Sequence, residues 1–282
     1  MTAAGPPDRL DATVARLRLE GRGAFSAYLC AGHPDLATSE AMMAAAVEGG
    51  ADWLEFGIPF SDPAADGPVI QKATADALRA GTTVADCLVL ARRLRDRFPD
   101  TPLVAMTYAN LAHRRGWTGW ATALRDAGID ACILPDVPLE ESGPARAALA
   151  GAGLRWVPLV TPTTPPDRMR AIAASATGFL YVVGAVGITG RGDPGPLVEA
   201  TVRRARDAGA TVPLVVGFGI ASSDDVRRVL AAGADGAIVG SHLVRMVDDG
   251  CTPDALREEV GRLADGTRLK PGRRPQAGGP RG

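Results

Sequence analysis

Short apolar runs alternate eight times with longer amphipathic stretches, and this alternation constrains the fold more than any other feature. The runs predict strands, bounded by turn residues, at 25–30, 53–56, 103–107, 131–134, 156–160, 179–183, 214–216 and 236–239. Apolar residues three and four positions apart predict helices at 36–48, 69–80, 84–97, 118–127, 140–150, 166–174, 197–208, 223–231 and 241–263. A further amphipathic stretch at 10–20 precedes the first strand.

Eight strand–helix units favour a closed parallel (β/α)₈ barrel, or TIM barrel, over an open doubly wound sheet, because no GxGxxG fingerprint follows the first strand. We expect residues 1–264 to form one barrel domain, with the extra N-terminal helix covering its bottom. Residues 265–282 are rich in Gly, Pro and Arg and are predicted to be a flexible tail.

Two turn patterns recur at the ends of the expected helices. A Gly-Ala-Asp or Gly-Ile-Asp phrase precedes three of the strands, ending at Asp52, Asp130 and Asp235. Glycines that could take the left-handed cap conformation follow several helices, namely Gly49, Gly81, Gly128, Gly151, Gly209 and Gly233.

Charge and cysteine usage exclude several classes of protein. The formal net charge of −1 gives no overall basic field for nucleic acid or an anionic membrane, so an anionic ligand must be held locally. The four cysteines lack CxxC spacing and the three histidines lack metal-ligand spacing, so no metal site is expected. Neither a signal peptide nor a run of about 18 apolar residues is present, which predicts a cytoplasmic protein.

Two carboxylates bracket the most unusual stretch of the chain, which runs from Leu54 to Pro68. Glu55 closes an apolar run, where an unpaired acid would be costly to bury, and Asp66 lies in a stiff loop that also carries Asp62 between prolines. In a barrel this loop follows the second strand on the catalytic face. We therefore predict an active site at Glu55 and Asp66, although a capped or salt-bridged strand end is the alternative for Glu55.

Glycine-containing turns follow the last three strands and would lie on the same face. They are Gly187–Gly190, Gly217–Ile220 and Gly240–Ser241. The second and third each open a helix at the position where such barrels commonly bind phosphate, and free backbone N–H groups there can hold the anion without a lysine. The turns therefore predict a phosphorylated ligand.

Tyrosines and other polar residues would face the same mouth. Tyr28, Tyr108 and Tyr181 suggest a flat aromatic or hydroxylated substrate, whereas such a residue taken alone is more often a core or rim residue than a ligand. Asn110, Asp136 and Thr161 follow neighbouring strands.

Together these motifs resemble the α subunit of tryptophan synthase. The resemblance rests on Leu54–Gln71, Met106–Asn110, Pro135–Pro138 and the three glycine turns, and it runs in unbroken order from about Leu10 to Leu263. It implies a TIM barrel that cleaves indole-3-glycerol phosphate reversibly to indole and glyceraldehyde 3-phosphate. It implies no metal and no organic cofactor for this subunit.

The resemblance also implies roles for individual residues. Glu55 matches the general acid/base, and Asp66 matches the acid that engages the indole N–H. Tyr181 lines that site, and Met106 and Tyr108 line the indole pocket. The phosphate-binding turns correspond to Thr189, Gly190, Phe218, Gly219, Gly240 and Ser241.

Family members usually bind a β subunit, which joins indole to serine with pyridoxal phosphate, and the resemblance implies an α2β2 tetramer. Asp62 is a candidate contact with this partner, and a turn-capping aspartate is the alternative. At three positions, Tyr28, His33 and Gly184–Val186, the chain departs from patterns common in the family.

Three other functions remain open at this point. The chain could be a stand-alone lyase that releases free indole from the same substrate. It could be another phosphate-binding barrel enzyme, although its only lysines, Lys72 and Lys270, are badly placed for a Schiff-base aldolase. It could also be a regulatory subunit without catalysis, which the presence of both acids disfavours.

Overall fold

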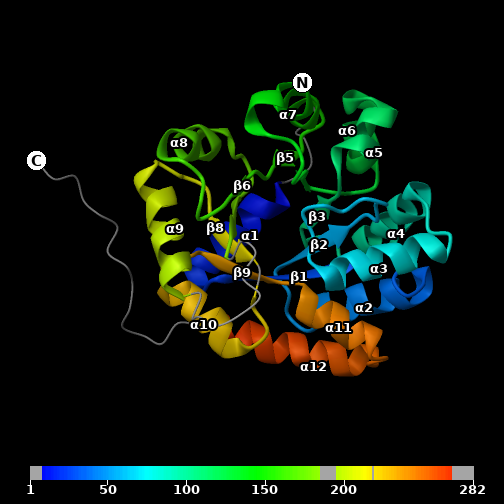
Figure 1. Ribbon diagram of the computed structural model, residues 1–282. Helices are drawn as coiled ribbons and strands as arrows, with labels where there is room; N and C mark the ends of the chain where they lie inside the picture. Colours follow the sequence, from blue (N-terminus) through cyan, green and yellow to red (C-terminus); the bar gives the residue numbers. More distant parts are fainter. Residues whose placement is uncertain (1–7, 185–194, 218, 269–282) are drawn as a thin grey trace, which may run out of the picture.

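A computed structural model describes residues 8–184, 195–217 and 219–268 and has the predicted alternation of strands and helices (Figure 1). In this part of the chain every strand pairing is parallel, in the order β5-β4-β3-β2-β1-β9-β8-β7-β6. The strands are β1 (Ala24–Cys30), β2 (Trp53–Gly57), β3 (Leu103–Met106), β4 (Ala131–Ile133), β5 (Arg155–Trp156), β6 (Leu159–Val160), β7 (Leu180–Val183), β8 (Leu214–Gly217) and β9 (Gly236–Val239).

The barrel closes through the fifth predicted strand, which is divided into β5 and β6 around Val157 and Pro158. β5 pairs with β4, and β6 pairs with β7. The backbone between them serves both neighbours, because Val157 donates its N–H to Cys132 O and Pro158 O accepts from Tyr181 N. Proline has no N–H to donate to a strand ladder, which explains the break in an otherwise continuous segment.

Helices surround the sheet on the outside (Figure 1). They are α1 (Arg9–Glu20), α2 (Leu36–Glu48), α3 (Pro68–Arg79), α4 (Val84–Arg97), α5 (Ala109–Arg115), α6 (Trp117–Asp126), α7 (Gly143–Gly151), α8 (Pro166–Ser175), α9 (Gly195–Asp207), α10 (Ser223–Ala231), α11 (Ser241–Asp248) and α12 (Pro253–Ala264), with 3₁₀ turns η1 (Leu139–Glu141) and η2 (Asp265–Thr267). None of these described helices is long and apolar enough to cross a membrane.

The predicted N-terminal helix covers the bottom of the barrel. Leu10 and Leu17 of α1 are buried in a cluster with Trp53 and Phe179, which come from the amino-terminal ends of the barrel segments. The rings of Trp53 and Phe179 stack with centroids 5.5 Å apart. This apolar plug excludes water from the end of the barrel opposite the catalytic face.

One helix prediction was wrong, and one helix was missed. The segment 241–263 is two helices rather than one, because Gly250 turns the chain with φ 78° and Thr252 caps a new helix that has Pro253 in its first turn. The short helix α5 was not expected, because its seven residues are too few to show a helical period.

Two glycine predictions were also wrong. Gly49 has right-handed φ and ψ, and the left-handed residue is Gly50 with φ 105°. Gly151 lies inside α7, and Gly153 takes the left-handed conformation with φ 75°. In both loops the turn comes one or two residues later than expected.

The ordered domain continues past the expected boundary at residue 264. Gly266 and Thr267 of η2 are buried, and Thr267 O accepts from Gly23 N next to β1. Residues 269–282, which make up most of the predicted tail, lie outside the described residues.

The recurring aspartates form one repeated device at the bottom of the barrel. The carboxylates of Asp52, Asp130 and Asp235 accept the backbone N–H of Phe25, Leu103 and Leu214, respectively. Each aspartate returns its own N–H to the carbonyl of the same residue, at 2.8 Å in all three cases. Each also binds an arginine, namely Arg22, Arg95 and Arg206. These contacts hold the segment just before one strand in place beside the neighbouring strand.

Candidate active site

Glu55 is a buried carboxylic acid inside the barrel. It lies in the middle of β2, opposite Tyr28 of β1, and only 1% of its surface is exposed. Its Oε2 has no hydrogen-bond partner among the described residues. Burial, and secondarily the nearby Asp66, raise the pKa of Glu55 to about 8, so the carboxyl holds its proton at neutral pH. The salt-bridged alternative for Glu55 is therefore wrong.

Asp66 reaches the same space from the loop between β2 and α3. Tyr108 donates its hydroxyl to Asp66 Oδ2 at 2.9 Å and accepts the N–H of Ala65 at 3.1 Å, so a single side chain fixes the end of the loop. Burial raises the pKa of Asp66 to about 6, and the Tyr108 hydrogen bond opposes that rise. At neutral pH Asp66 is therefore ionised while Glu55 is protonated.

Two buried tyrosines flank these acids, and glycines leave room for their hydroxyls. A Cβ added at Gly57 would lie 2.4 Å from the Tyr28 hydroxyl oxygen, and one added at Gly217 would lie 2.0 Å from that of Tyr181. Burial raises the pKa of both tyrosines well above the ordinary value, so both hydroxyls keep their protons. Tyr28 and Tyr181 therefore offer neutral donors beside two carboxyl groups.

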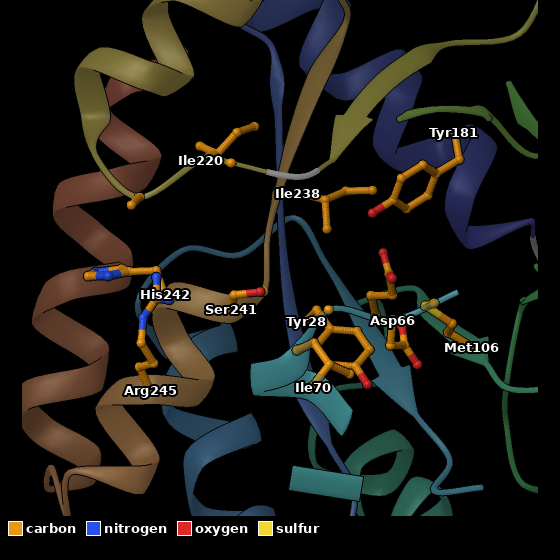
Figure 2. Close-up of a pocket in the computed structure, with 15 residues that line it drawn as sticks. Tyr28, Asp66, Ile70, Met106, Tyr181, Ile220, Ile238, Ser241, His242 and Arg245 are labelled. Carbon is orange, nitrogen blue, oxygen red and sulfur yellow. The ribbon is translucent and has the colours of Figure 1, made fainter. Parts of the chain in front are cut away.

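The side chains enclose a cavity of about 150 Å³ at the carboxyl ends of the strands (Figure 2). Glu55, Asp66 and the two tyrosines supply its polar wall, and Ile70, Met106 and Ile238 are among its apolar lining residues. Met106, Asp66 and Tyr181 also line an adjoining, larger cavity of about 980 Å³ that extends to the loops after β4 and β6. An apolar slot with a few convergent polar groups suits a flat aromatic ligand.

The far end of the cavity is built for an anion. Helix α11 begins at Ser241, and no side chain caps its first turn, so its N–H groups are open to a ligand. Gly219, with φ 75°, and Gly240 line the same end. Figure 2 shows Ser241 and Arg245 of α11 across the cavity from Asp66 and Tyr181.

The second helix that was predicted to open at the anion-binding end, α10, has a side-chain cap in its first turn. Ser222 caps α10 by accepting from Asp225 N, and the Asp225 carboxylate accepts from Ala221 N at 3.0 Å. The side chains of Ser222 and Asp225 thus satisfy the N–H groups of Asp225 and Ala221. The turn after β8 also brings Gly219 to the cavity.

Two basic residues at this end were missed from the sequence. His242 and Arg245 of α11 line the cavity, and His242 Nε2 lies 2.6 Å from Glu259 Oε1 of α12. The sequence feature that could have revealed them is their spacing. His242 is one residue and Arg245 four residues after Ser241, which places Arg245 one helical turn from the anion-binding end. Charged residues on the surface of an amphipathic helix usually face solvent, so the pattern alone did not indicate a site.

The remaining predicted residues lie as follows. Asp62 is exposed and accepts a 2.5 Å hydrogen bond from its neighbour Ser61, which agrees with its position on the outer loop. Asp136 accepts the N–H of Ala109 and so holds the start of α5. Thr189, Gly190 and Phe218 lie outside the described residues.

Comparison with known proteins adds the family. Residues 14–268 match the family model described as tryptophan synthase alpha chain. The chain belongs to this family. A tryptophan synthase alpha chain of Rhizorhabdus wittichii is 42% identical over 242 residues, which cover 86% of this chain and 89% of the relative. One from Methanopyrus kandleri is 40% identical over 254 residues, covering 88% and 91%.

Solved structures agree with this family assignment. A structure of Mycobacterium tuberculosis tryptophan synthase superposes with a TM-score of 0.86 at 35% identity, covering 93% of this chain and 99% of that one. The tryptophan synthase subunit alpha of Legionella pneumophila superposes with a TM-score of 0.83 at 32% identity, covering 92% and 98%. Family membership confirms the predicted TIM barrel and the predicted function, a lyase of tryptophan biosynthesis that cleaves indole-3-glycerol phosphate.

Proposed function

We propose that Glu55 and Asp66 carry out the cleavage of indole-3-glycerol phosphate to indole and glyceraldehyde 3-phosphate. The observation that carries this assignment is the opposite protonation of two acids that line one cavity. The buried Glu55 has a pKa of about 8 and Asp66 a pKa of about 6, so one can donate a proton while the other is an anion.

The reaction requires both states. Glu55 transfers its proton to C3 of the indole, which places a positive charge on the ring nitrogen. The Asp66 carboxylate stabilises this charge from the indole N–H side. Ionised Glu55 then removes the proton of the glycerol hydroxyl next to the ring. The oxygen electron pair forms the aldehyde carbonyl, the C3–carbon bond breaks, and its electrons return to the ring and neutralise the nitrogen.

The uncapped end of α11 supports the position of the phosphate. The N–H groups near Ser241 and the backbone of Gly219 and Gly240 would hold the dianion, and Arg245 adds a positive charge. Anchoring the phosphate at one end and the indole ring at the other would place the bond to be broken beside Glu55. Holding the substrate in this orientation would itself contribute to the rate enhancement, because the reacting groups are already positioned before the proton transfer.

The second component of the proposal is a β subunit, with the two chains in an α2β2 assembly and indole passing to the partner. The names of the relatives, which are alpha chains, favour this over a stand-alone lyase. The test is indole release by the purified chain alone and with a β subunit. Slow release that rises strongly on addition of the partner supports the proposal, and equally fast release without it supports the stand-alone lyase.

Asp62 offers a separate test of the partner contact. It is exposed and does not line either cavity, so Asp62→Asn should leave indole release by the isolated chain unchanged. We expect the concentration of β subunit needed for half-maximal activation to rise by about tenfold, since one charged contact with the partner would be lost. An unchanged activation curve would leave Asp62 only its turn-capping role.

A further inference from the structure

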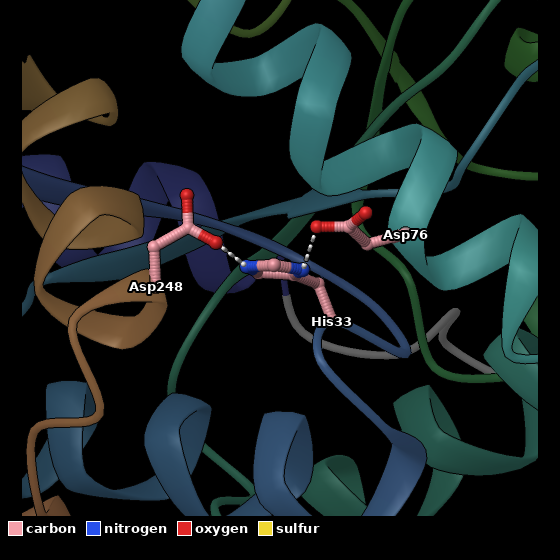
Figure 3. A group of neighbouring side chains, drawn as sticks. All are labelled: His33, Asp76 and Asp248. Atoms are coloured by element: carbon pink, nitrogen blue, oxygen red, sulfur yellow. Dashed lines mark ion pairs between the residues drawn. The ribbon is translucent and has the colours of Figure 1, made fainter.

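A second group of titratable side chains lies on the outer layer of the barrel, away from the two acids. His33, in the loop after β1, lies between Asp76 of α3 and Asp248 of α11, and Figure 3 shows the imidazole with one carboxylate facing each ring nitrogen. Its Nε2 is 3.2 Å from Asp248 Oδ1, and its Nδ1 is 3.9 Å from Asp76 Oδ2.

The imidazole is buried without a satisfied nitrogen. His33 is 4% exposed, and neither Nδ1 nor Nε2 makes a hydrogen bond within the described residues. Both nitrogens contact a carboxylate, but neither contact has hydrogen-bond geometry. Native structures rarely leave buried polar groups without a hydrogen-bond partner, so this arrangement calls for an explanation.

A lysine ammonium lies between the two carboxylates. Lys72 Nζ is 2.8 Å from Asp76 Oδ2 and 2.7 Å from Asp248 Oδ1, the same two oxygens that face the imidazole. The Lys72 side chain is 57% exposed, so it can leave along its own flexible stem at little cost. Arg79 pairs with the other oxygen of Asp76, Oδ1, so Lys72 supplies the positive charge at the two oxygens that face the imidazole, and this ammonium can be replaced.

We propose that His33, Asp76 and Asp248 form a binding site for a divalent transition-metal ion such as Zn²⁺, which enters by displacing Lys72. One ligand atom from each residue lies within 4.8 Å of the others. One imidazole and two carboxylates suit zinc and cobalt, whereas Mg²⁺ and Ca²⁺ prefer oxygen ligands alone. Water completes the coordination on the exposed side.

The location of this site gives metal binding a consequence for the proposed function. The metal binding itself does not depend on that function. Helix α3 begins two positions after Asp66, and α11 begins at Ser241 by the anion-binding end. A metal ion would therefore join the two helices that carry opposite ends of the substrate cavity. Binding to the folded state alone would also stabilise the protein in proportion to the ion concentration.

The test uses the full chain, freed of metal with a chelator. Zn²⁺ binding is measured by calorimetry, and Co²⁺ binding by the visible absorption of a four-coordinate ion. We expect one ion per chain, and His33→Asn should weaken binding by more than about tenfold because a ligand is removed. Lys72→Met removes the competing ammonium and should tighten binding by about tenfold.

The opposite signs of these effects make the test decisive even if one variant folds poorly. His113 is an exposed histidine elsewhere on the barrel, so His113→Asn is the matched control and should bind as the wild type does. Binding that is lost on His242→Asn instead of His33→Asn, or a Lys72→Met variant with unchanged or weaker affinity, would overturn the proposal. Failure of metal binding would leave the assignment of Glu55 and Asp66 intact.

Discussion

At the residue scale, the burial of the Glu55 carboxyl affects both the stability of the fold and the proton transfer proposed for the reaction. A carboxylic acid with no compensating cation is costly to ionise, and the same cost keeps its proton available for transfer. Asp66 differs because Tyr108 donates to it, which favours the anion. Two acids a short distance apart in the sequence thereby take different protonation states from their surroundings.

The pH dependence of kcat/KM follows from these states. Below about pH 6 Asp66 is protonated and cannot stabilise the cationic ring, so activity should rise as pH increases through 6. Above about pH 8 Glu55 has lost its proton, so activity should fall. In Asp66→Asn the falling limb should move to lower pH, because the charge of Asp66 helps to raise the pKa of Glu55. A pH profile without a falling limb would contradict the role of Glu55.

Glu55 also predicts how stability changes with pH. Its pKa is near 4.5 unfolded and about 8 folded, so from pH 4.5 to 8 the unfolded state binds fewer protons and folding stability falls as pH rises. Glu55→Gln removes this dependence. The free energy of unfolding of Glu55→Gln minus that of the wild type, measured in urea, should be about 2–3 kcal/mol larger at pH 7 than at pH 5. The same difference at both pH values would mean that Glu55 is ionised in the folded protein.

Much of the site could be predicted from residues, because Glu55, Asp66 and the tyrosines lie at strand ends and in a loop whose composition is unusual for packing alone. Arg245 and His242 could not, because a charged residue on an amphipathic helix has the same pattern whether it faces solvent or a ligand. The side-chain cap of α10 was not predicted either. It depends on the positions of Ser222 and Asp225, which the preceding glycine turn does not indicate.

At the element scale, the repeated aspartates should differ in energy according to their burial. The side chains of Asp130 and Arg95 are 10% and 7% exposed, whereas those of Asp235 and Arg206 are 42% and 37% exposed. Asp130→Ala leaves a buried charge without its partner and should cost about 3–5 kcal/mol of stability. Asp235→Ala should cost about 1 kcal/mol, because its ion pair is screened by water.

Urea unfolding of the two variants checks this expectation. Each aspartate accepts one backbone N–H, Asp130 from Leu103 and Asp235 from Leu214. Equal losses of stability in Asp130→Ala and Asp235→Ala would show that this kind of hydrogen bond supplies most of the stabilisation. The ion pair with Arg95 would then be a weak contributor.

Elements with strong periodicity were predictable, and their junctions were not. The helices at 36–48, 84–97 and 223–231 have the predicted bounds because Asp35, Thr83 and Ser222 supply clear caps. The division at 241–263 was missed although Gly250 and Pro253 signal it, because apolar residues continue in helical phase across the break. The division of the fifth strand at Pro158 was missed because it depends on tertiary pairing. One half of the segment pairs with β4 and the other half with β7.

At the scale of the whole molecule, the barrel brings together groups that are far apart in the chain. The acids come from β2 and its loop, and the anion-binding end comes from α11, about 180 residues later. The overall charge of −1 cannot attract a phosphorylated substrate, so in the proposed function recognition would depend on the local backbone and on Arg245.

The most direct test of the central claim is the rate of indole formation from indole-3-glycerol phosphate by the wild type and by Glu55→Gln, each with saturating β subunit. The wild type should release indole and glyceraldehyde 3-phosphate in equal amounts. Glu55→Gln should lose about 10²–10⁴-fold or more in kcat with substrate affinity largely retained, because only the proton transfer is removed. Near-normal cleavage by Glu55→Gln would contradict the account.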